Sequence, residues 1–186
     1  MRQHESRINL ILLFHIRSTV QSFLFYSYLH RVPTNHLDGH AILKHVGRSW
    51  EKLMLDLVAY VDGGSLGNPG PAGVGVVIEG LEKGRITVGK WVGRQDNNVA
   101  EYLALLEALQ RAHELNARKL HVYSDSQVVV RQMIGQYNCR SPRLYSLHWL
   151  CRKLAHSLEF SISHIRREFN SEANGLASAA ARCGLM

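Results

Sequence analysis

Cysteine is scarce in this sequence of 186 residues, which contains only Cys139, Cys151 and Cys183. The number is odd and no two of them have a metal-ligand spacing, which argues against both a disulfide framework and a cysteine metal site. Buried thiols that act as small hydrophobic side chains are the simpler interpretation. We therefore expect a protein of a reducing compartment, located in the cytoplasm.

Long apolar runs are also missing. Residues 8–16 form a largely apolar run of nine residues, and residues 20–29 form a second, interrupted one, whereas a membrane-spanning helix needs about 20 apolar residues. Arg2 and Arg7 provide the basic start of a secretory signal, but no convincing cleavage site follows, and Glu5 counts against a mitochondrial presequence. The sequence therefore predicts no membrane association.

The first 53 residues differ from the rest, because they hold six of the eleven histidines and only two of the fifteen glycines. His36, His40 and His45 could suggest a metal site, but only Asp38 adds an acidic partner, so surface histidines are the favoured interpretation. Met54 directly precedes the first strong strand signal. We expect residues 54–186 to form the functional domain, and residues 1–53 to be an extension from a mis-called start codon or a targeting segment.

Positive charge exceeds negative charge, with a formal net charge of +7 and a pI of about 9.6. This balance favours a polyanionic partner such as nucleic acid, although a solvated basic surface fits equally well. With 46% hydrophobic residues the chain can bury a core, and its length suits one domain. We expect a monomer.

Three strands, then helices alternating with strands, are expected after residue 54. Short β-branched runs predict the strands, and apolar residues at helical spacing predict the first long helix, with Asn97 or Asn98 as its cap. Strands are expected at residues 55–61, 73–78, 85–92, 119–123 and 158–165, and helices at 99–115, 126–134, 142–156 and 170–181. This order predicts an α/β fold whose mixed sheet has helices on both faces.

Acidic residues stand where the expected strands end. Asp62 ends the first strand, Asp125 ends the fourth, and Glu101 lies in the first turn of the first long helix. If these strands are parallel neighbours, the two aspartates project side by side and Glu101 can reach the same point. Crowded carboxylates are best tolerated around hard cations such as Mg²⁺ or Mn²⁺. The alternative is that each is a surface charge or a helix cap, as Asp125 before Ser126 could be.

The sequences around these acids are more specific than the acids alone. They read YVDGGS at residues 60–65, GNPGPAG at 67–73, NVAEY at 98–102 and YSDSQ at 123–127. Together they strongly resemble the type 1 ribonuclease H family, from about residue 57 to residue 182. The glycine-rich string lacks the Lys-Ser/Thr ending of a P-loop, which disfavours a nucleoside triphosphate site.

The resemblance implies a ribonuclease H-like fold, a five-stranded mixed sheet with helices on both faces. It also implies hydrolysis of the RNA strand of RNA/DNA hybrids, with Asp62, Glu101 and Asp125 matching three metal-binding acids of the family. Two divalent cations, Mg²⁺ or Mn²⁺, would activate a water and stabilise the leaving 3′ oxygen. The products would carry 5′-phosphate and 3′-hydroxyl ends.

Selection of RNA over DNA requires contacts with the 2′-hydroxyl group. Glycine lets backbone groups approach a substrate closely, and amide side chains can both donate and accept. For Asn68, turn formation is an equally good interpretation, whereas Gln127, beside Asp125, favours substrate contact. The expected substrate-binding residues are Gly63, Gly64, Ser65, Asn68, Asn97, Asn98 and Gln127.

One position departs from the family pattern. The last helix usually carries a fourth acid in a pattern like N-x-x-A-D-x-L-A, and Asn174 stands in its place here. Asn174 can ligate a metal through its carbonyl oxygen but brings no charge, so we expect one metal to bind more weakly. Glu172 is a poor substitute, because residues two apart on a helix face different sides. Gly175 also weakens this helix, by about 0.5–1 kcal/mol.

These features predict an active enzyme that needs a high metal concentration and favours Mn²⁺. The alternative of another class is a catalytically silent module that keeps the fold and binds nucleic acid. The three acids Asp62, Glu101 and Asp125 argue against that alternative, because a binding module has no reason to hold repelling carboxylates. A third hypothesis is a related nuclease that acts on another RNA-containing substrate, since fold does not fix substrate.

Two features that vary within the family are also informative. His164 is expected at the end of the last strand, with a structural or backbone-contacting role rather than the catalytic role that a loop histidine has in some relatives. The basic helical handle that many relatives use to hold the hybrid does not fit between residues 136 and 142. Other basic side chains could form a modest phosphate-binding surface or simply be solvated; they are Arg131, Arg140, Arg143, Arg152 and Lys153.

Overall fold

A computed structural model describes residues 55–184 of the chain. The two apolar runs, the histidines His36, His40 and His45 and the extension expected at residues 1–53 lie outside the described residues. Within the described part, no helix combines the length and apolar character needed to cross a bilayer. The three cysteines are free thiols.

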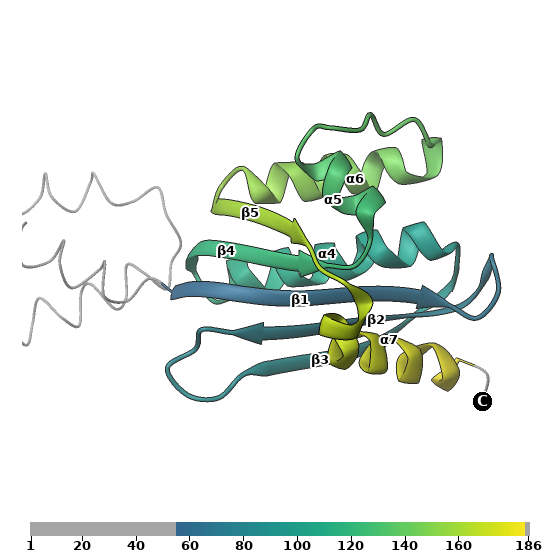
Figure 1. The fold of residues 1–186 in the computed structure, drawn as a ribbon, viewed down its shortest axis with the longest axis horizontal. Helices are drawn as coiled ribbons and strands as arrows, with labels where there is room; N and C mark the ends of the chain where they lie inside the picture. Colours follow the sequence, from purple (N-terminus) through teal and green to yellow (C-terminus); the bar gives the residue numbers. More distant parts are fainter. Residues whose placement is uncertain (1–54, 185–186) are drawn as a thin grey trace, which may run out of the picture. The chain divides into compact units, whose positions relative to one another are not determined.

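Five strands form one mixed sheet in the order β3-β2-β1-β4-β5 (Figure 1). β1 pairs antiparallel with β2, and β2 with β3, whereas β1, β4 and β5 run parallel to one another. The strands are β1 Leu55–Ser65, β2 Gly70–Glu79, β3 Ile86–Gln95, β4 Ala117–Ser124 and β5 Glu159–His164. The five-stranded mixed sheet expected from the sequence is confirmed.

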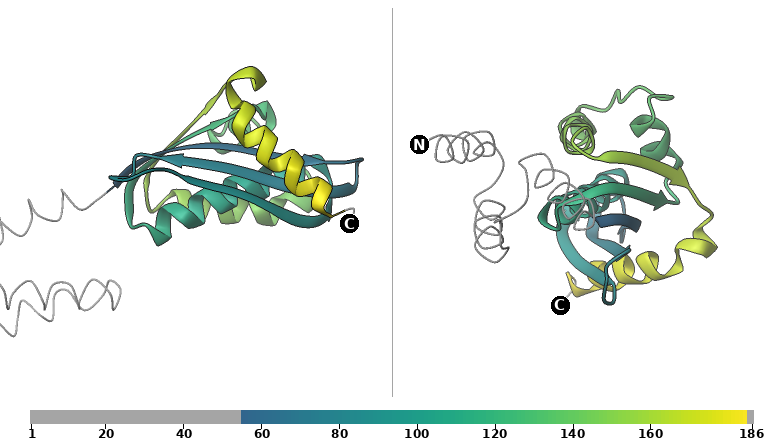
Figure 2. Two further views of the ribbon diagram at one scale, coloured as in Figure 1. Left: turned by 90° about the horizontal axis from the view of Figure 1, so that it is seen from below. Right: turned by 90° about the vertical axis from the view of Figure 1, so that its left-hand side faces the viewer.

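Helices cover both faces of the sheet, as Figure 2 shows. α4 lies on one face with α6 packed against it, and α7 lies on the other face, over β1, β2 and β3. The helices are α4 Asn97–Glu114, α5 Gln127–Met133, α6 Pro142–Ala155 and α7 Ser171–Cys183, and a 3-10 turn, η1 Arg167–Asn170, precedes α7. This arrangement confirms the predicted α/β class.

The first hairpin is longer than the sequence suggested. The expectation that β1 ends at Asp62 is wrong, because pairing with β2 continues until Ser65 faces Ala72. β2 accordingly starts at Gly70 rather than at residue 73. Asp62 therefore lies inside a paired strand, opposite Gly75, and its backbone is held on that side by the sheet.

The main core lies between the sheet and α4. Leu57 and Val61 of β1 are buried together with Leu105 and Leu109 of α4. Successive side chains of a strand point to opposite faces, so burying these residues of β1 sends Asp62 to the face that α7 covers. The hydrophobic pattern of β1 thus determines the side of the sheet on which its carboxylate appears.

α7 packs on β2 backbone to backbone. A Cβ atom at Gly75 would lie 2.0 Å from the carbonyl oxygen of Ala173, and one at Gly73 would lie 2.3 Å from that of Ala177. No side chain fits at either position, so glycine is required for this close approach. The contact sets the height of α7 above the sheet and, with it, the position of Asn174.

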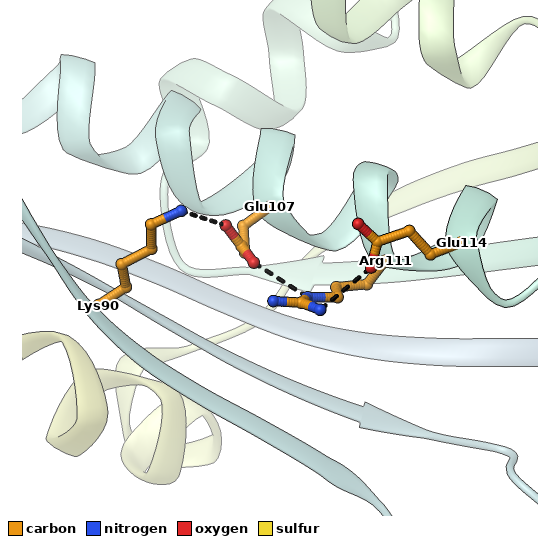
Figure 3. A network of polar contacts seen from close by, with 4 residues as sticks. All are labelled: Lys90, Glu107, Arg111 and Glu114. Carbon is orange, nitrogen blue, oxygen red and sulfur yellow. Dashed lines mark hydrogen bonds and ion pairs between the residues drawn. The ribbon is translucent and has the colours of Figure 1, made fainter.

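A buried carboxylate joins the edge strand β3 to α4, as Figure 3 shows. Glu107 is only 6% exposed, and its oxygens pair with Lys90 at 3.1 Å and with Arg111 at 3.0 Å. Arg111 also pairs with Glu114 at 3.0 Å. Because a buried charge is costly unless it is paired, this network ties β3 to the helix that carries Glu101.

α4 begins earlier than expected. Its N-cap residue is Asp96, not Asn97 or Asn98, and the Asp96 carboxylate pairs with Arg143 of α6 at 2.6 Å. Asn97 is consequently the first residue of the helix. The first-turn position expected for Glu101 is wrong for this reason, because Glu101 lies just beyond that turn.

Candidate active site

Two carboxylates meet where β1 and β4 run side by side. The strands are parallel, and Val61 of β1 faces Ser124 of β4 in their register. The next residue along each chain is an aspartate, Asp62 in β1 and Asp125 directly after β4. Their carboxyl groups lie within hydrogen-bonding reach of each other. The parallel pairing of the first and fourth strands therefore places these two acids together.

The surroundings of Asp62 disfavour its charged form. Burial, followed by the negative charge of Asp125 and the hydrogen bond between the two carboxyl groups, raises the pKa of Asp62 to about 7. Arg167 acts in the opposite direction, and Glu101 adds a weaker repulsion. The pair thus favours a shared proton or, equally, a cation that takes the place of that proton.

Glu101 reaches the site from α4, on the other side of the sheet. One of its carboxylate oxygens accepts a hydrogen bond from the Ser126 hydroxyl at 2.5 Å, and the other accepts from the Asn97 amide at 3.0 Å. Burial raises the pKa of Glu101, the two hydrogen bonds lower it, and the negative charge of Asp125 raises it again. The net direction is upward, because desolvation is the largest cause.

The Ser126 hydroxyl makes two hydrogen bonds, one as a donor and one as an acceptor. It is the N-cap of α5, accepting from the backbone N–H of Val129 at 3.4 Å while donating to Glu101. The alternative that Asp125 is itself a helix cap is therefore wrong, because Ser126 occupies that position. The role of Ser126 toward Glu101 escaped sequence reasoning, although a serine at a helix start is a recognisable capping signal.

Two asparagines hold the aspartate pair from the start of α7. The Asn174 amide nitrogen donates to Asp62 at 3.1 Å. Asn170, only 1% exposed, donates from its own amide nitrogen to Asp125 at 3.0 Å and to the backbone carbonyl of Val61 at 2.9 Å. Sequence reasoning missed Asn170. The signal was its spacing of four residues from Asn174, which places both on one helix face.

These side chains line one cleft of about 710 Å³. The cleft contains the four residues expected to be catalytic, Asp62, Glu101, Asp125 and Asn174. Its remaining lining residues are Gly63, Gly64, Ser65, Leu66, Asn97, His164, Arg166, Arg167, Glu168, Ser178 and Ala181.

Basic side chains lie on the cleft side formed by the segment between β5 and α7. Arg166 and Arg167 are exposed and line the cleft, and Arg167 is close enough to Asp62 to influence its pKa. His164 is also exposed and lines the cleft. β5 ends at His164, as expected from the sequence, and the structural or backbone-contacting role of this residue stays a prediction.

The glycines expected to contact substrate differ from one another. A Cβ atom at Gly63 would lie 2.1 Å from backbone atoms of Ala100, so this glycine allows β1 to approach the start of α4. Gly64 has open space around the same position. The Ser65 backbone N–H donates to the Asn97 side chain at 3.3 Å. Of these three residues, Gly64 is the one that leaves room beside the cleft.

The remaining expected contacts lie outside the cleft lining. The Asn68 side chain accepts a hydrogen bond from the backbone N–H of Asn97 at 3.0 Å, and so ties the first turn to the start of α4. Asn98 and Gln127 are exposed at the starts of α4 and α5. Their expected contacts with a substrate stay predictions.

The oxygen atoms of these side chains suit a hard cation, although the acidic side chains do not all lie close to one another. Within residues 55–184, no three His, Cys, Asp or Glu side chains are close enough to hold one ion by themselves. Asp62 and Asp125 lie together, whereas both oxygens of Glu101 are occupied by Ser126 and Asn97. Carboxylate and amide oxygens are the ligands that Mg²⁺ and Mn²⁺ prefer.

A family model described as "Reverse transcriptase-like" matches residues 60–180 of the chain. The chain is 38% identical over 124 residues to the ribonuclease HI of Halobacterium salinarum, which covers 66% of this chain and 62% of that protein. It is 36% identical over 129 residues to a bifunctional protein of Mycobacterium tuberculosis, covering 68% of this chain and 35% of that protein. The chain thus spans about three-fifths of the first relative and about a third of the second.

Solved structures with this fold include two ribonucleases at more than 30% identity. The ribonuclease H1 of Halobacterium salinarum superimposes with a TM-score of 0.65 at 36% identity, covering 69% of this chain and 98% of that one. LC11-RNase H1, whose structure is in complex with an RNA/DNA hybrid, superimposes with a TM-score of 0.65 at 33% identity. That match covers 70% of this chain and 100% of the other.

Proposed function

This chain belongs to the reverse transcriptase-like family of type 1 ribonuclease H domains, and on that premise we propose that it is a metal-dependent endonuclease that hydrolyses the RNA strand of RNA/DNA hybrids. The products carry 5′-phosphate and 3′-hydroxyl ends. We assign the activity to residues 54–186 and regard residues 1–53 as an extension of that domain. We further propose that the protein is a monomer and that it is located in the cytoplasm. The three free thiols support a reducing compartment.

The observation that carries the proposal is the aspartate pair. Asp62 in β1 and Asp125 directly after β4 lie together in one cleft, where burial and mutual repulsion raise the pKa of Asp62 to about 7. Such a pair destabilises the folded protein unless positive charge is bound. A cleft that is lined by basic residues and holds this pair suits the phosphate backbone of a nucleic acid together with divalent cations.

The residues fit two divalent cations, Mg²⁺ or Mn²⁺. Asp62 and Asp125 would hold them from the sheet, Glu101 would join by exchanging one of its hydrogen bonds, and Asn174 would contribute its amide oxygen after rotating about its Cβ–Cγ bond. When bound, such cations polarise the scissile phosphate, lower the pKa of the attacking water and neutralise the leaving oxygen. Asn174 would bring no charge to the cation that it helps to hold, because its side chain is neutral.

Neighbouring side chains orient these groups and the substrate. Asn170 holds Asp125, and Ser126 together with Asn97 holds Glu101 until substrate and cation enter. Arg166 and Arg167 are placed to contact phosphates that flank the scissile one. These contacts position the substrate backbone but carry no information about whether the strand is RNA.

Recognition of RNA is assigned to the start of α4 and its neighbours. Gly64, Ser65 and Asn97 line the cleft, whereas Asn98 and Gln127 are exposed at the starts of α4 and α5, outside the cleft lining. Backbone and amide groups can read a 2′-hydroxyl group as both donor and acceptor. For Asn68 we propose an indirect role, because its side chain is engaged in holding Asn97.

A second candidate function is a nucleic-acid-binding module without catalysis. The observation that favours it is the direction of the Asn174 amide, which presents a hydrogen-bond donor to Asp62 where the family pattern has an acid. A third is hydrolysis of another RNA-containing substrate, because the cleft chemistry fits any phosphodiester.

The test uses the full chain, with Asp62→Asn as the matched control because it keeps the side-chain shape and removes the charge. End-labelled RNA/DNA hybrid, RNA duplex, DNA duplex and single-stranded RNA are incubated with Mg²⁺ or Mn²⁺. The expected result is cleavage of the RNA strand of the hybrid, and its loss in the control. Binding without cleavage in either metal would support the module, and preferential cleavage of RNA duplex or single-stranded RNA would redefine the substrate.

A further inference from the structure

A continuous part of the chain that includes α5 and α6 carries no acidic residue. From residue 126 to residue 158 the sequence has no Asp or Glu. The same 33 residues contain five cationic side chains: Arg131, Arg140, Arg143, Arg152 and Lys153. Within residues 55–184, Arg143 is the one among them that pairs with a carboxylate, that of Asp96. The segment therefore contributes positive charge and no negative charge of its own.

The outer face of α6 adds exposed aromatic rings to this charge. Tyr145 is 62% exposed and Trp149 is 56% exposed, and Arg152 and Lys153 are exposed one turn further along the helix. These positions, at i, i+4, i+7 and i+8, share one face of a helix. We call them the α6 stripe. The opposite face of the helix is buried through Leu144, Cys151 and Ala155.

The rings of the α6 stripe are open to a flat ligand. The Lys153 ammonium group lies 5.1 Å from the centroid of the Trp149 ring, in a cation–π contact. Trp149 stays 56% exposed despite this contact, which adds positive charge over the ring. Tyr145 lies one helical turn away, which is about 6 Å along the axis. Two aromatic platforms at this separation, with a cation at the Trp149 ring, can stack successive bases of one strand.

We propose that the α6 stripe binds single-stranded nucleic acid at a place separate from the catalytic cleft. Exposed aromatic side chains that accept base stacking, combined with cations that follow the phosphates, are the composition of sequence-tolerant single-strand sites. No stripe residue lines the cleft. The five cations and the absence of acids between residues 126 and 158 favour a polyanionic occupant of the stripe over a protein surface. The assignment is independent of the proposed hydrolytic activity.

The experiment measures binding of the full chain to a fluorescently labelled oligo-dT of about 16 nucleotides, long enough for a site of this kind. The buffer contains EDTA and no RNA, so that neither hydrolysis nor metal binding contributes. Trp149→Ala is compared with Trp91→Ala, a tryptophan of similar exposure (52%) on β3. Lys153→Ala is compared with Lys83→Ala, which removes the same charge from the β2–β3 turn.

Wild-type protein is expected to bind oligo-dT, Trp149→Ala to weaken binding by about fivefold or more, and Trp149→Phe to retain most of it. Trp91→Ala and Lys83→Ala are expected to bind like wild type. The proposal fails if wild type does not bind, if both tryptophan variants lose affinity equally, or if Trp149→Ala binds as tightly as wild type. Thermal melting of each variant shows whether weaker binding comes from the missing side chain or from unfolding of the protein. Because the assay contains no hybrid, failure to cleave hybrids would leave its outcome unchanged.

Discussion

Asn174 donates a hydrogen bond from its amide nitrogen to a carboxylate oxygen of Asp62 across 3.1 Å. The donor partly offsets the repulsion between Asp62 and Asp125, but it brings no negative charge for a cation. In the family pattern an acid stands at this position. The site therefore has the residues that hold its carboxylates in place. Its negative charge is lower by one than that of a site with an acid at position 174.

Replacing Asn174 with Asp should lower the Mg²⁺ concentration that half-saturates hydrolysis by about tenfold, because one added charge near a cation contributes on the order of 1–2 kcal/mol. A metal titration of initial rates measures this. Ser178→Asp is the control, since Ser178 lines the same cleft one helical turn further along α7. Equal shifts in both variants would indicate a general effect of net charge, and an unchanged Asn174→Asp titration would remove Asn174 from the metal site.

Asp62→Asn should abolish hydrolysis and yet stabilise the metal-free protein. The substitution removes a buried charge that Asp125 repels, and we expect a gain on the order of 1–2 kcal/mol at pH 8 in EDTA. Thermal melting is the measurement. Asp56→Asn, in the same strand but exposed and paired with Arg118, should change stability by no more than about 0.5 kcal/mol. A destabilised Asp62→Asn protein would show that the pair is not strained without metal.

Metal-free stability should fall as pH rises from about 4 to about 7. The folded-state pKa of Asp62 is raised from its ordinary value of 3.8 to about 7. The folded protein therefore binds more protons than the unfolded chain within this window, and each rise in pH favours unfolding. Glu101 contributes in the same direction. A bound cation replaces the proton, so Mg²⁺ affinity should increase between pH 6 and pH 8. Calorimetric titration at several pH values checks this, and an affinity independent of pH would contradict it.

Ser126→Ala should lower both stability and activity. The loss of the α5 cap costs about 0.5–2 kcal/mol, and Glu101 loses one of the two groups that hold it. Ser126→Thr keeps the hydroxyl and should recover most of both properties. Urea denaturation and hybrid cleavage are measured together. If Ser126→Ala lost stability but kept full activity, Ser126 would be a cap alone.

Two glycines on facing elements should respond in opposite directions to substitution by alanine. Gly75→Ala forces a Cβ atom into the Ala173 carbonyl oxygen and should displace α7, with a loss of more than about 2 kcal/mol and of metal-dependent activity. Gly175 has open space around it, so Gly175→Ala should stabilise α7 by about 0.5–1 kcal/mol. Thermal melting of the two variants checks both signs. A tolerated Gly75→Ala would mean that α7 can move away from β2 without cost.

The element order and the meeting of Asp62 with Asp125 could be predicted from the sequence, because both follow from strand periodicity. Hydrophobic alternation places β1 and β4 in the sheet, and parallel neighbours bring their carboxyl ends to one place. Glu101 was expected beside them from the local motif. These predictions depend on backbone geometry, which the chain specifies locally.

Contacts between elements distant in sequence could not be predicted in the same way. The hydrogen bonds of Asn170 to Asp125 and of Ser126 to Glu101 depend on side-chain rotations after the helices have packed. The contact of Gly63 could not be predicted for the same reason, because its neighbour Ala100 is distant in sequence. The sequence instead suggested that this glycine allows close approach of a substrate. The length of the first hairpin was underestimated because the glycines and prolines of β2 are typical of turns.

The close packing of α7 on Gly73 and Gly75 fixes the position of residue 174 independently of the chemical type of its side chain. Main-chain atoms of β2 and α7 lie in direct contact. The position of the residue 174 side chain is therefore set by the backbone of α7. An exchange between amide and carboxylate there would leave the scaffold unaltered. Catalytic strength in such a protein can therefore be adjusted over evolutionary time by one substitution, while the architecture stays constant.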